Sequence, residues 1–283
     1  MNSQEFARWR HHPTAPVQPL VMGIVNATPD SFHDGREDFH PTHAYDRAMR
    51  LLDDGADLLD VGGESTRPGA APVGVQEELD RVIPVIMRIK EQSDVCISID
   101  TFKAPVMREA VRAGAAWIND IMALRHDAAL ATVAELDVPV CLMHMQGVPS
   151  SMQQSPTYHR PVVEEIQAFF SERVAVCVQA GLRREQLILD PGFGFGKSYE
   201  HNMSLMQHVA DFRVHGLPLL LGVSHKRSLG VILNDPLADR VYAGLTLAIY
   251  AVLQGVSIIR THDAKPTRDA LMAIAALNDR SME

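Results

Sequence analysis

Residues 57–67 read Asp-Leu-Leu-Asp-Val-Gly-Gly-Glu-Ser-Thr-Arg, an apolar run over Asp57–Val61 that stops at a cluster of glycine and polar residues. Near-continuous apolar runs of this length are typical of strands buried on both faces, as in a parallel sheet. The pattern recurs along the chain. The other runs, each with the residues at which it stops, are Leu20–Val25 at Asn26, Val95–Ile99 at Asp100, Ala115–Ile118 at Asn119-Asp120, Val138–Met143 at His144, Leu187–Leu189 at Asp190, Leu217–Val223 at Ser224-His225-Lys226-Arg227, and Val256–Ile259 at Arg260-Thr261-His262-Asp263.

The segments between these runs carry apolar residues at helical spacing, for example Thr42–Gly55, Gln76–Lys90 and Pro161–Gly181. The order is therefore strand then helix, repeated eight times, which predicts an α/β protein with a single (β/α)8 TIM barrel. The 283 residues suit one barrel of about 250 residues with additions, and no linker divides them. We predict an N-terminal extension over residues 1–19 and a barrel over residues 20–283.

Three connections at the carboxyl ends of the predicted strands are long enough to serve as mobile loops over the barrel mouth. They are Asn26–Phe39, Glu64–Val75 and Gln146–Arg160.

Composition excludes several classes of partner. The formal net charge is -9, from 26 basic and 35 acidic residues, which disfavours nucleic acid and anionic lipid as partners. The start of the chain is polar, and no apolar run is long enough to span a membrane. Three cysteines are an odd number, and two fall in predicted strands, which indicates buried thiols in a reducing compartment. We expect a cytoplasmic protein.

Polar side chains at the carboxyl ends of strands meet at the mouth of such a barrel, where its chemistry takes place. Asp100, Asn119 and Asp190 each follow a predicted strand. Two carboxylates and an amide suit a heterocycle that offers N–H and NH2 donors. Alternatively, each of the three only caps the helix that follows it.

Arg67, Arg260 and His262 form a second group at the predicted mouth. Guanidinium groups bind phosphate oxygens, although these residues also suit a rim of salt bridges. Asn26 follows the first strand and offers a neutral oxygen to Mg2+, which takes few protein ligands when substrate phosphates supply the rest. The 13 histidines have no zinc-site spacing.

The glycine-rich segment Asp190–Ser198 is not a nucleotide-binding P-loop, because Pro191 occupies the position of the first glycine of that motif. It is either a tight turn or a turn that lets the backbone approach a ligand.

Five motifs extend from the predicted strands into the residues that follow them. They are Gly23-Ile24-Val25-Asn26-Ala27-Thr28-Pro29-Asp30-Ser31-Phe32, Asp60-Val61-Gly62-Gly63-Glu64-Ser65-Thr66-Arg67-Pro68-Gly69, Cys141-Leu142-Met143-His144-Met145-Gln146-Gly147, Asp190-Pro191-Gly192-Phe193-Gly194-Phe195-Gly196-Lys197 and Arg260-Thr261-His262-Asp263. In this order, from about Leu20 to the C-terminus, the sequence resembles the dihydropteroate synthase family.

The resemblance implies that the protein joins 6-hydroxymethyl-7,8-dihydropterin diphosphate to p-aminobenzoate in folate biosynthesis, by ionisation of the pyrophosphate leaving group. It also implies a Mg2+ cofactor, sulfonamides as inhibitors and a homodimer. The residues that it assigns to the pterin ring are Asp100, Asn119, Asp190 and Lys226. Those for the diphosphate and Mg2+ are Asn26, Arg67, Arg260 and His262. Those that frame p-aminobenzoate are Phe32, Asp34, Thr66, Pro68, Phe195, Lys226 and Arg227, and Met143 and Gly222 are further substrate-binding residues. Of these, the residues expected to be catalytic are Asp34, Arg67, Asp100, Lys226, Arg260 and His262.

The chain departs from the family pattern at Ala27 and Thr261, where valine is usual, and at His225, where arginine is usual. His225 either weakens the positive charge on the p-aminobenzoate side or points away from the mouth. Two other functions stay open: a barrel that transfers a methyl group from a folate to a corrinoid protein, and a non-catalytic paralogue that binds pterin or a partner enzyme. The diphosphate residues argue against the methyltransferase.

Overall fold

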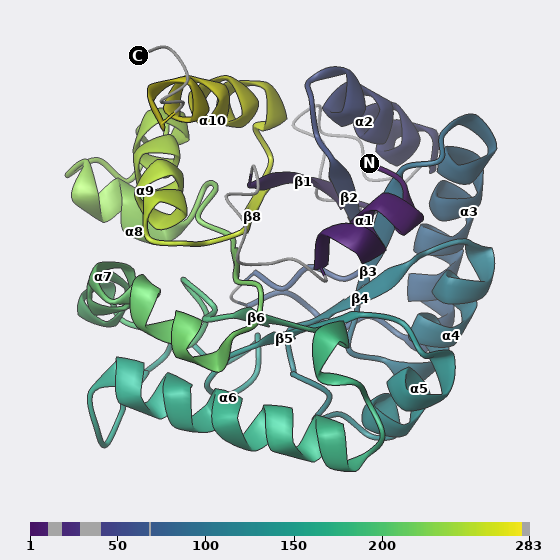
Figure 1. The fold of residues 1–283 in the computed structure, drawn as a ribbon, viewed down its shortest axis with the longest axis horizontal. Helices are drawn as coiled ribbons and strands as arrows, with labels where there is room; N and C mark the ends of the chain where they lie inside the picture. The colour runs from purple at the N-terminus through teal and green to yellow at the C-terminus, as the bar shows by residue number, and fades with distance from the viewer. Residues whose placement is uncertain (11–18, 29–40, 68, 279–283) are drawn as a thin grey trace.

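The computed structural model describes residues 1–10, 19–28, 41–67 and 69–278 (Figure 1). Eight parallel strands form one sheet with the order β6-β5-β4-β3-β2-β1-β8-β7. A bridge between Leu189 and Leu219 and a 3.0 Å hydrogen bond from the Leu189 N–H to the Pro218 carbonyl bring the two edge strands together. The predicted (β/α)8 barrel is therefore confirmed. The strands are β1 (Leu20–Asn26), β2 (Leu58–Gly62), β3 (Cys96–Asp100), β4 (Trp117–Asp120), β5 (Val140–Met143), β6 (Leu187–Asp190), β7 (Leu220–Leu221) and β8 (Ile258–Thr261).

Helices surround the sheet (Figure 1). The α-helix Tyr199–Gln207 is followed by a 3-10 helix, Val209–His215. No α-helix among the described residues is long and apolar enough to cross a membrane. The α-helices are α1 (Ser3–Arg10), α2 (Pro41–Asp53), α3 (Val75–Gln92), α4 (Ala104–Ala113), α5 (Ala129–Leu136), α6 (Val162–Gln179), α7 (Tyr199–Gln207), α8 (Arg227–Ile232), α9 (Val241–Leu253) and α10 (Ala264–Asn278).

Most strands continue beyond their apolar runs into the polar residues that follow. Asn26, Asp100 and Asp190 are the last residues of their strands, not the first residues of loops. In the ladder, Gly62 pairs with Asp100, and Asp100 pairs with Asn119. These polar side chains therefore stand at similar heights on rigid elements. In contrast, β7 is much shorter than its apolar run, because Pro218 within that run has no N–H to donate to the sheet.

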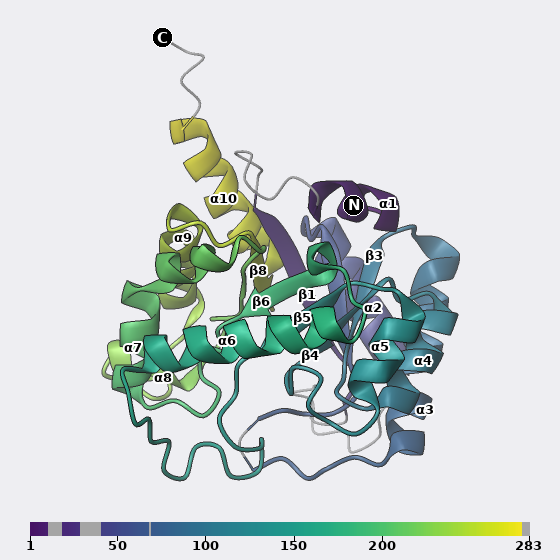
Figure 2. The same ribbon diagram turned by 60° about the horizontal axis from the view of Figure 1, so that its bottom comes forward.

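The amino end of the barrel is closed by α1, which lies across it (Figure 2). Phe6 is only 1% exposed, and its ring centroid lies 5.0 Å from that of Trp117 inside the barrel. This apolar cluster also includes Trp9 of α1 and the inward-facing Met22 of β1. Part of the segment expected to be an extension thus fills one end of the barrel, and the opposite end is left for polar side chains.

Candidate active site

Alternate residues of each strand face the barrel axis, and their character changes along that axis. On β3, Cys96 belongs to the apolar cluster at the amino end, whereas Ser98 and then Asp100 follow on the same face. On β8, Ile258 is followed in the same way by Arg260. A layer of polar side chains therefore follows the apolar layer toward the carboxyl end of the strands. The predicted site residues converge in this polar layer.

Arg260 is the centre of this layer. Its Nε donates to Asp60 Oδ2 at 2.5 Å, and its Nη2 donates to Asp100 Oδ2 at 2.7 Å. Asn119 Nδ2 donates to the same oxygen of Asp60 at 3.0 Å, and the Ser98 hydroxyl donates to the other. Asp100, Asn119 and Arg260 are thus brought together, through a carboxylate that was not predicted.

Burial dominates the electrostatics of the polar layer. It raises the pKa of Asp100 to about 7, although Arg260 opposes the shift. Burial by itself would lower the pKa of Arg260, but Asp60 and Asp100 outweigh it and raise that pKa. The guanidinium therefore stays charged, and the two carboxylates depend on it as their counter-ion.

Asp190 and Lys226 line the next part of the mouth. Asp190 Oδ1 accepts a 2.7 Å hydrogen bond from the Gly192 N–H, and burial raises the pKa of Asp190 to about 6. Burial, aided by Arg260, lowers the pKa of Lys226 to about 8. The Lys226 ammonium lies 4.1 Å from the ring centroid of Phe195, which packs in a cluster with Met143.

The glycine-rich segment after β6 is a tight turn packed against the loop after β5. A Cβ on Gly192, which has a φ of +70°, would lie 1.9 Å from the His144 carbonyl oxygen. The Lys197 ammonium lies within this turn, 2.9 Å from His144 Nδ1 and 2.9 Å from the Gly192 carbonyl oxygen. The close approach is therefore to protein backbone, and His144 is a buried residue.

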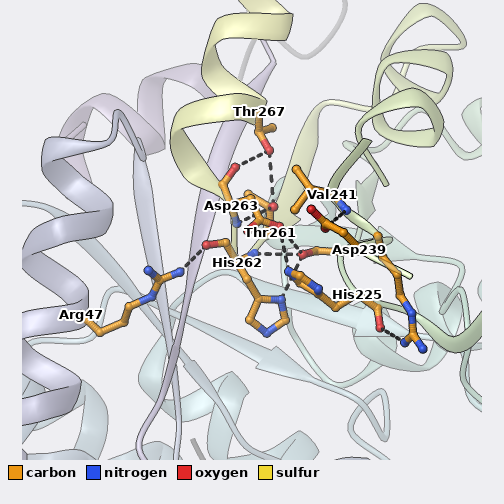
Figure 3. Close-up of polar contacts among 10 residues, drawn as sticks. Arg47, His225, Asp239, Val241, Thr261, His262, Asp263 and Thr267 are labelled. Carbon is orange, nitrogen blue, oxygen red and sulfur yellow. Dashed lines mark hydrogen bonds and ion pairs between the residues drawn. The ribbon is translucent and has the colours of Figure 1, made fainter. Parts of the chain in front are cut away.

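The ends of β7 and β8 are joined by polar contacts (Figure 3). Ser224 Oγ lies 3.0 Å from His262 Nδ1, and His225 Nε2 lies 2.9 Å from Asp263 Oδ2. Arg47 of α2 donates to the His262 carbonyl oxygen. Burial, with Arg260 and His225 nearby, lowers the pKa of His262 to about 3, so the free protein holds this imidazole neutral. His225 thus engages Asp263, and its ring lies beside that of His262.

The loop after β2 is anchored by buried charges. Lys103 pairs with Glu64 of this loop and with Glu78 of α3. Thr66 is half-buried, whereas Arg67 is exposed and lies close enough to lower the pKa of Lys226.

The remaining predicted residues fall into two groups. Gly222 follows β7 beside Arg260, since a Cβ there would lie 3.7 Å from Arg260 Cβ, and Arg227 is the exposed first residue of α8. The others, Phe32, Asp34 and Pro68, lie outside the described residues.

Asn26 fits the single protein ligand expected for Mg2+. It ends β1 on the inward-facing side, half-buried, and its side chain forms no hydrogen bond with another described residue. Within the described ranges, no three His, Cys, Asp or Glu side chains are grouped to hold a metal by themselves. The donor set therefore suits an ion that takes most of its oxygen ligands from substrate and water.

The pattern of apolar runs missed Asp60, because it lies inside a run and not at its end. A signal was present, since a charged residue in a buried strand is rare unless it is paired. The sequence carried no comparable signal for Lys103 and Asp263. Lys103 pairs with Glu64 and Glu78, and Asp263 pairs with His225, and all of these partners are distant in the sequence.

Comparisons with known proteins relate this chain to one family. A family model described as pterin binding enzyme matches residues 22–262. Dihydropteroate synthase of Escherichia coli (strain K12) is 48% identical over 258 residues, which are 91% of this chain and 91% of that protein. The solved structure of Yersinia pestis dihydropteroate synthase in complex with a sulfonamide drug is 47% identical, covers 92% of this chain and 94% of its own, and has a TM-score of 0.87. The Xanthomonas albilineans enzyme with 4-aminobenzoic acid is 45% identical, covers 93% and 94%, and has a TM-score of 0.87. The chain belongs to the dihydropteroate synthase family.

Proposed function

We propose that the polar layer at the barrel mouth catalyses the dihydropteroate synthase reaction, with the residues described above in distinct roles. The C–O bond between the pterin methylene and the diphosphate breaks, and its electron pair leaves with pyrophosphate. The p-aminobenzoate nitrogen then forms a bond to the methylene carbon and loses a proton. The observation that carries the proposal is the cluster of Asp60, Asp100, Asn119 and Arg260 at the carboxyl end of the strands.

Asp190, Asn119 and Asp100 would hold the pterin ring, with Met143, Lys226 and Gly222 beside it. Their carboxylate and amide groups match the N–H, NH2 and carbonyl groups of a pterin edge. The two carboxylates also favour positive charge on the pterin methylene as the leaving group departs. Pterin N–H donors stabilise the charged form of a carboxylate, so binding would lower the pKa values of Asp190 and Asp100, which burial raises.

Arg67, Arg260 and His262 would bind the diphosphate, since they carry its complementary charge or hydrogen-bond donors. Asn26 would hold Mg2+, which neutralises charge on the leaving group when it is bound. Thr66, Phe195, Lys226 and Arg227 would frame p-aminobenzoate, and Phe32, Asp34 and Pro68 keep the same expected role. Sulfonamides are expected to inhibit, because one is bound to the relative from Yersinia pestis.

Pyrophosphate release on mixing pterin diphosphate, p-aminobenzoate and Mg2+ tests the reaction directly. Turnover that requires all three, with dihydropteroate as product, is the expected result. A protein that binds pterin without releasing pyrophosphate would instead be the non-catalytic paralogue, and methyl transfer from a folate to a corrinoid protein would identify the other alternative.

Asp190→Asn is expected to weaken pterin binding about 5- to 150-fold, because a pterin donor would lose its charged acceptor. Calorimetric titration with the pterin substrate measures this. Asp120→Asn is the matched control. Like Asp190, Asp120 is buried, accepts a 2.7 Å hydrogen bond from the N–H two residues further along the chain, and has its pKa raised to about 6 by burial. Unlike Asp190, it faces away from the barrel axis. Equal pterin affinity in wild type and Asp190→Asn would remove Asp190 from the site.

We also propose a homodimer in the cytoplasm. The three cysteines are free and buried, which suits a reducing compartment. The helix α9 exposes Tyr242, Tyr250 and Leu253, and apolar side chains gathered on one surface are typical of protein interfaces.

Leu253→Glu is expected to shift the protein from dimer to monomer in sedimentation experiments, because it places a charge on this face. Val214→Glu is the control: Val214 is 76% exposed against 55% for Leu253, and it lies in the 3-10 helix before β7. A wild type that sediments as a monomer, or a Leu253→Glu variant that remains a dimer, would contradict this interface.

A further inference from the structure

Four side chains link the loop after β7 to the end of β8 (Figure 3). His225 Nε2 lies 2.9 Å from Asp263 Oδ2, and the same carboxylate oxygen lies 3.3 Å from Ser224 Oγ. Ser224 Oγ lies 3.0 Å from His262 Nδ1 and accepts a 3.2 Å hydrogen bond from the His262 N–H. His225 adopts the left-handed region with a φ of +55°, and Arg240 donates to its carbonyl oxygen at 3.1 Å. The backbone thus holds the imidazole of His225 toward Asp263.

The hydroxyl proton of Ser224 has two possible acceptors in this link, Asp263 Oδ2 and His262 Nδ1. If Ser224 donates to His262 Nδ1, the neutral imidazole of His262 carries its proton on Nε2. If Ser224 donates to Asp263, His262 must donate from Nδ1, and its Nε2 is a bare acceptor. His262 Nε2 forms no hydrogen bond with another described residue, so nothing else among them selects the tautomer.

The charge of His225 is expected to shift the balance between the two arrangements. A protonated His225 neutralises Asp263 and leaves the Ser224 proton to His262, whereas a neutral His225 leaves Asp263 as the stronger acceptor. The hydrogen bond to Asp263 raises the pKa of His225, although burial opposes this shift. The hydrogen bond from His225 lowers the pKa of Asp263. Both shifts favour the ion pair of a protonated His225 and an ionised Asp263.

Other charged groups that face His225 modulate its titration. Ahead of α9, Asp239 favours the protonated form and Arg240 disfavours it. The ring of His262 lies 5.2 Å from that of His225, edge to face, and Lys226 is the next residue in the chain. The pair of His225 and Asp263 is complete below the ordinary histidine pKa and is lost as the pH rises through the raised value.

We propose that His225 is a positioning residue that acts through Asp263 and Ser224 to keep a proton on Nε2 of His262. In that state His262 donates a hydrogen bond to the departing diphosphate; in the other state an unprotonated nitrogen meets phosphate oxygens. The consequence for the leaving group rests on the role proposed above for His262, whereas the tautomer is a property of the free protein. An enzyme with arginine at this position would lack the pH dependence, because arginine stays charged.

Nitrogen-15 NMR of histidine-labelled protein without ligands tests the tautomer, with the His262 signals assigned from a His262→Gln variant. In wild type, His262 should carry its proton on Nε2 at pH 6 and shift toward Nδ1 as His225 titrates. His225→Arg should keep the Nε2 proton throughout, and His225→Gln should favour Nδ1 throughout. Ser224→Ala should leave the titration of His225 intact but uncouple it from His262. An identical His262 tautomer in wild type and His225→Arg at every pH would overturn the proposal.

Calorimetric binding of pyrophosphate with Mg2+ tests the consequence. Pyrophosphate itself ionises with pH, and this effect cancels in the ratio of the wild-type Kd to the His225→Arg Kd. The ratio should rise about two- to fivefold from pH 6 to pH 8.5. A constant ratio would overturn the role in leaving-group binding. Turnover of wild type at pH 7 tests the proposed reaction separately. The proposed reaction and the proposed role of His225 can therefore fail independently.

Discussion

Replacing Arg260 by glutamine is expected to lower kcat/KM for the pterin diphosphate about 100- to 1,000-fold, because the variant loses the charged donor that we propose for the leaving group. It should also lower the free energy of unfolding by about 3–5 kcal/mol at pH 8. The physical reason is that Asp60, which is fully buried, and Asp100 would share no counter-ion. Steady-state kinetics and urea unfolding followed by circular dichroism measure the two effects.

The loss of stability should depend on pH. Without Arg260, protonation of Asp100, whose pKa burial raises to about 7, relieves its repulsion with Asp60, so the deficit should be smaller at pH 5.5 than at pH 8. Arg183→Gln is the control: Arg183 pairs with Asp137, and the two side chains are 60% and 62% exposed. An exposed pair contributes less than about 1 kcal/mol, and this one lies outside the polar layer. A deficit for Arg260→Gln as small as that of the control would show that the buried pairs contribute little.

Gly192→Ala is expected to lower the free energy of unfolding by about 2–5 kcal/mol. The left-handed backbone itself disfavours alanine by about 1–2 kcal/mol. In addition, the new methyl group would lie 1.9 Å from the His144 carbonyl oxygen, so the turn after β6 must move away from the loop after β5. The movement would also disturb the hydrogen bond from the Gly192 N–H to Asp190, so pterin affinity should fall as well.

Gly216→Ala separates the two contributions. Gly216 also has a positive φ, +60°, but a Cβ there would meet no atom within 4 Å. Urea unfolding of both variants should therefore show only the backbone contribution, about 1–2 kcal/mol, for Gly216→Ala. Equal losses would mean that the loops separate readily and that the turn is not held by close packing.

Periodicity was sufficient to predict the barrel, because a strand buried on both faces needs an unbroken apolar run and a polar stop marks its end. The same pattern predicted that Asp100, Asn119 and Asp190 converge, and the structure places these residues in or beside one polar layer. Strand ends were less accurate: β3 and β6 include the aspartate taken as the stop. Hydrogen bonding of the sheet, not side-chain polarity, decides where a strand ends.

What the sequence determined by itself was therefore everything that local alternation encodes: the strand–helix order, the barrel, and the strand ends at which chemistry gathers. Only the tertiary structure revealed the pairing of Arg260 with Asp60, some 200 residues away, and the contact of His225 with Asp263. These contacts arise when the sheet curls and brings β8 beside β1 and β7. A local pattern records which face a residue occupies, whereas the partner of a buried charge depends on which distant strand closes the barrel against it.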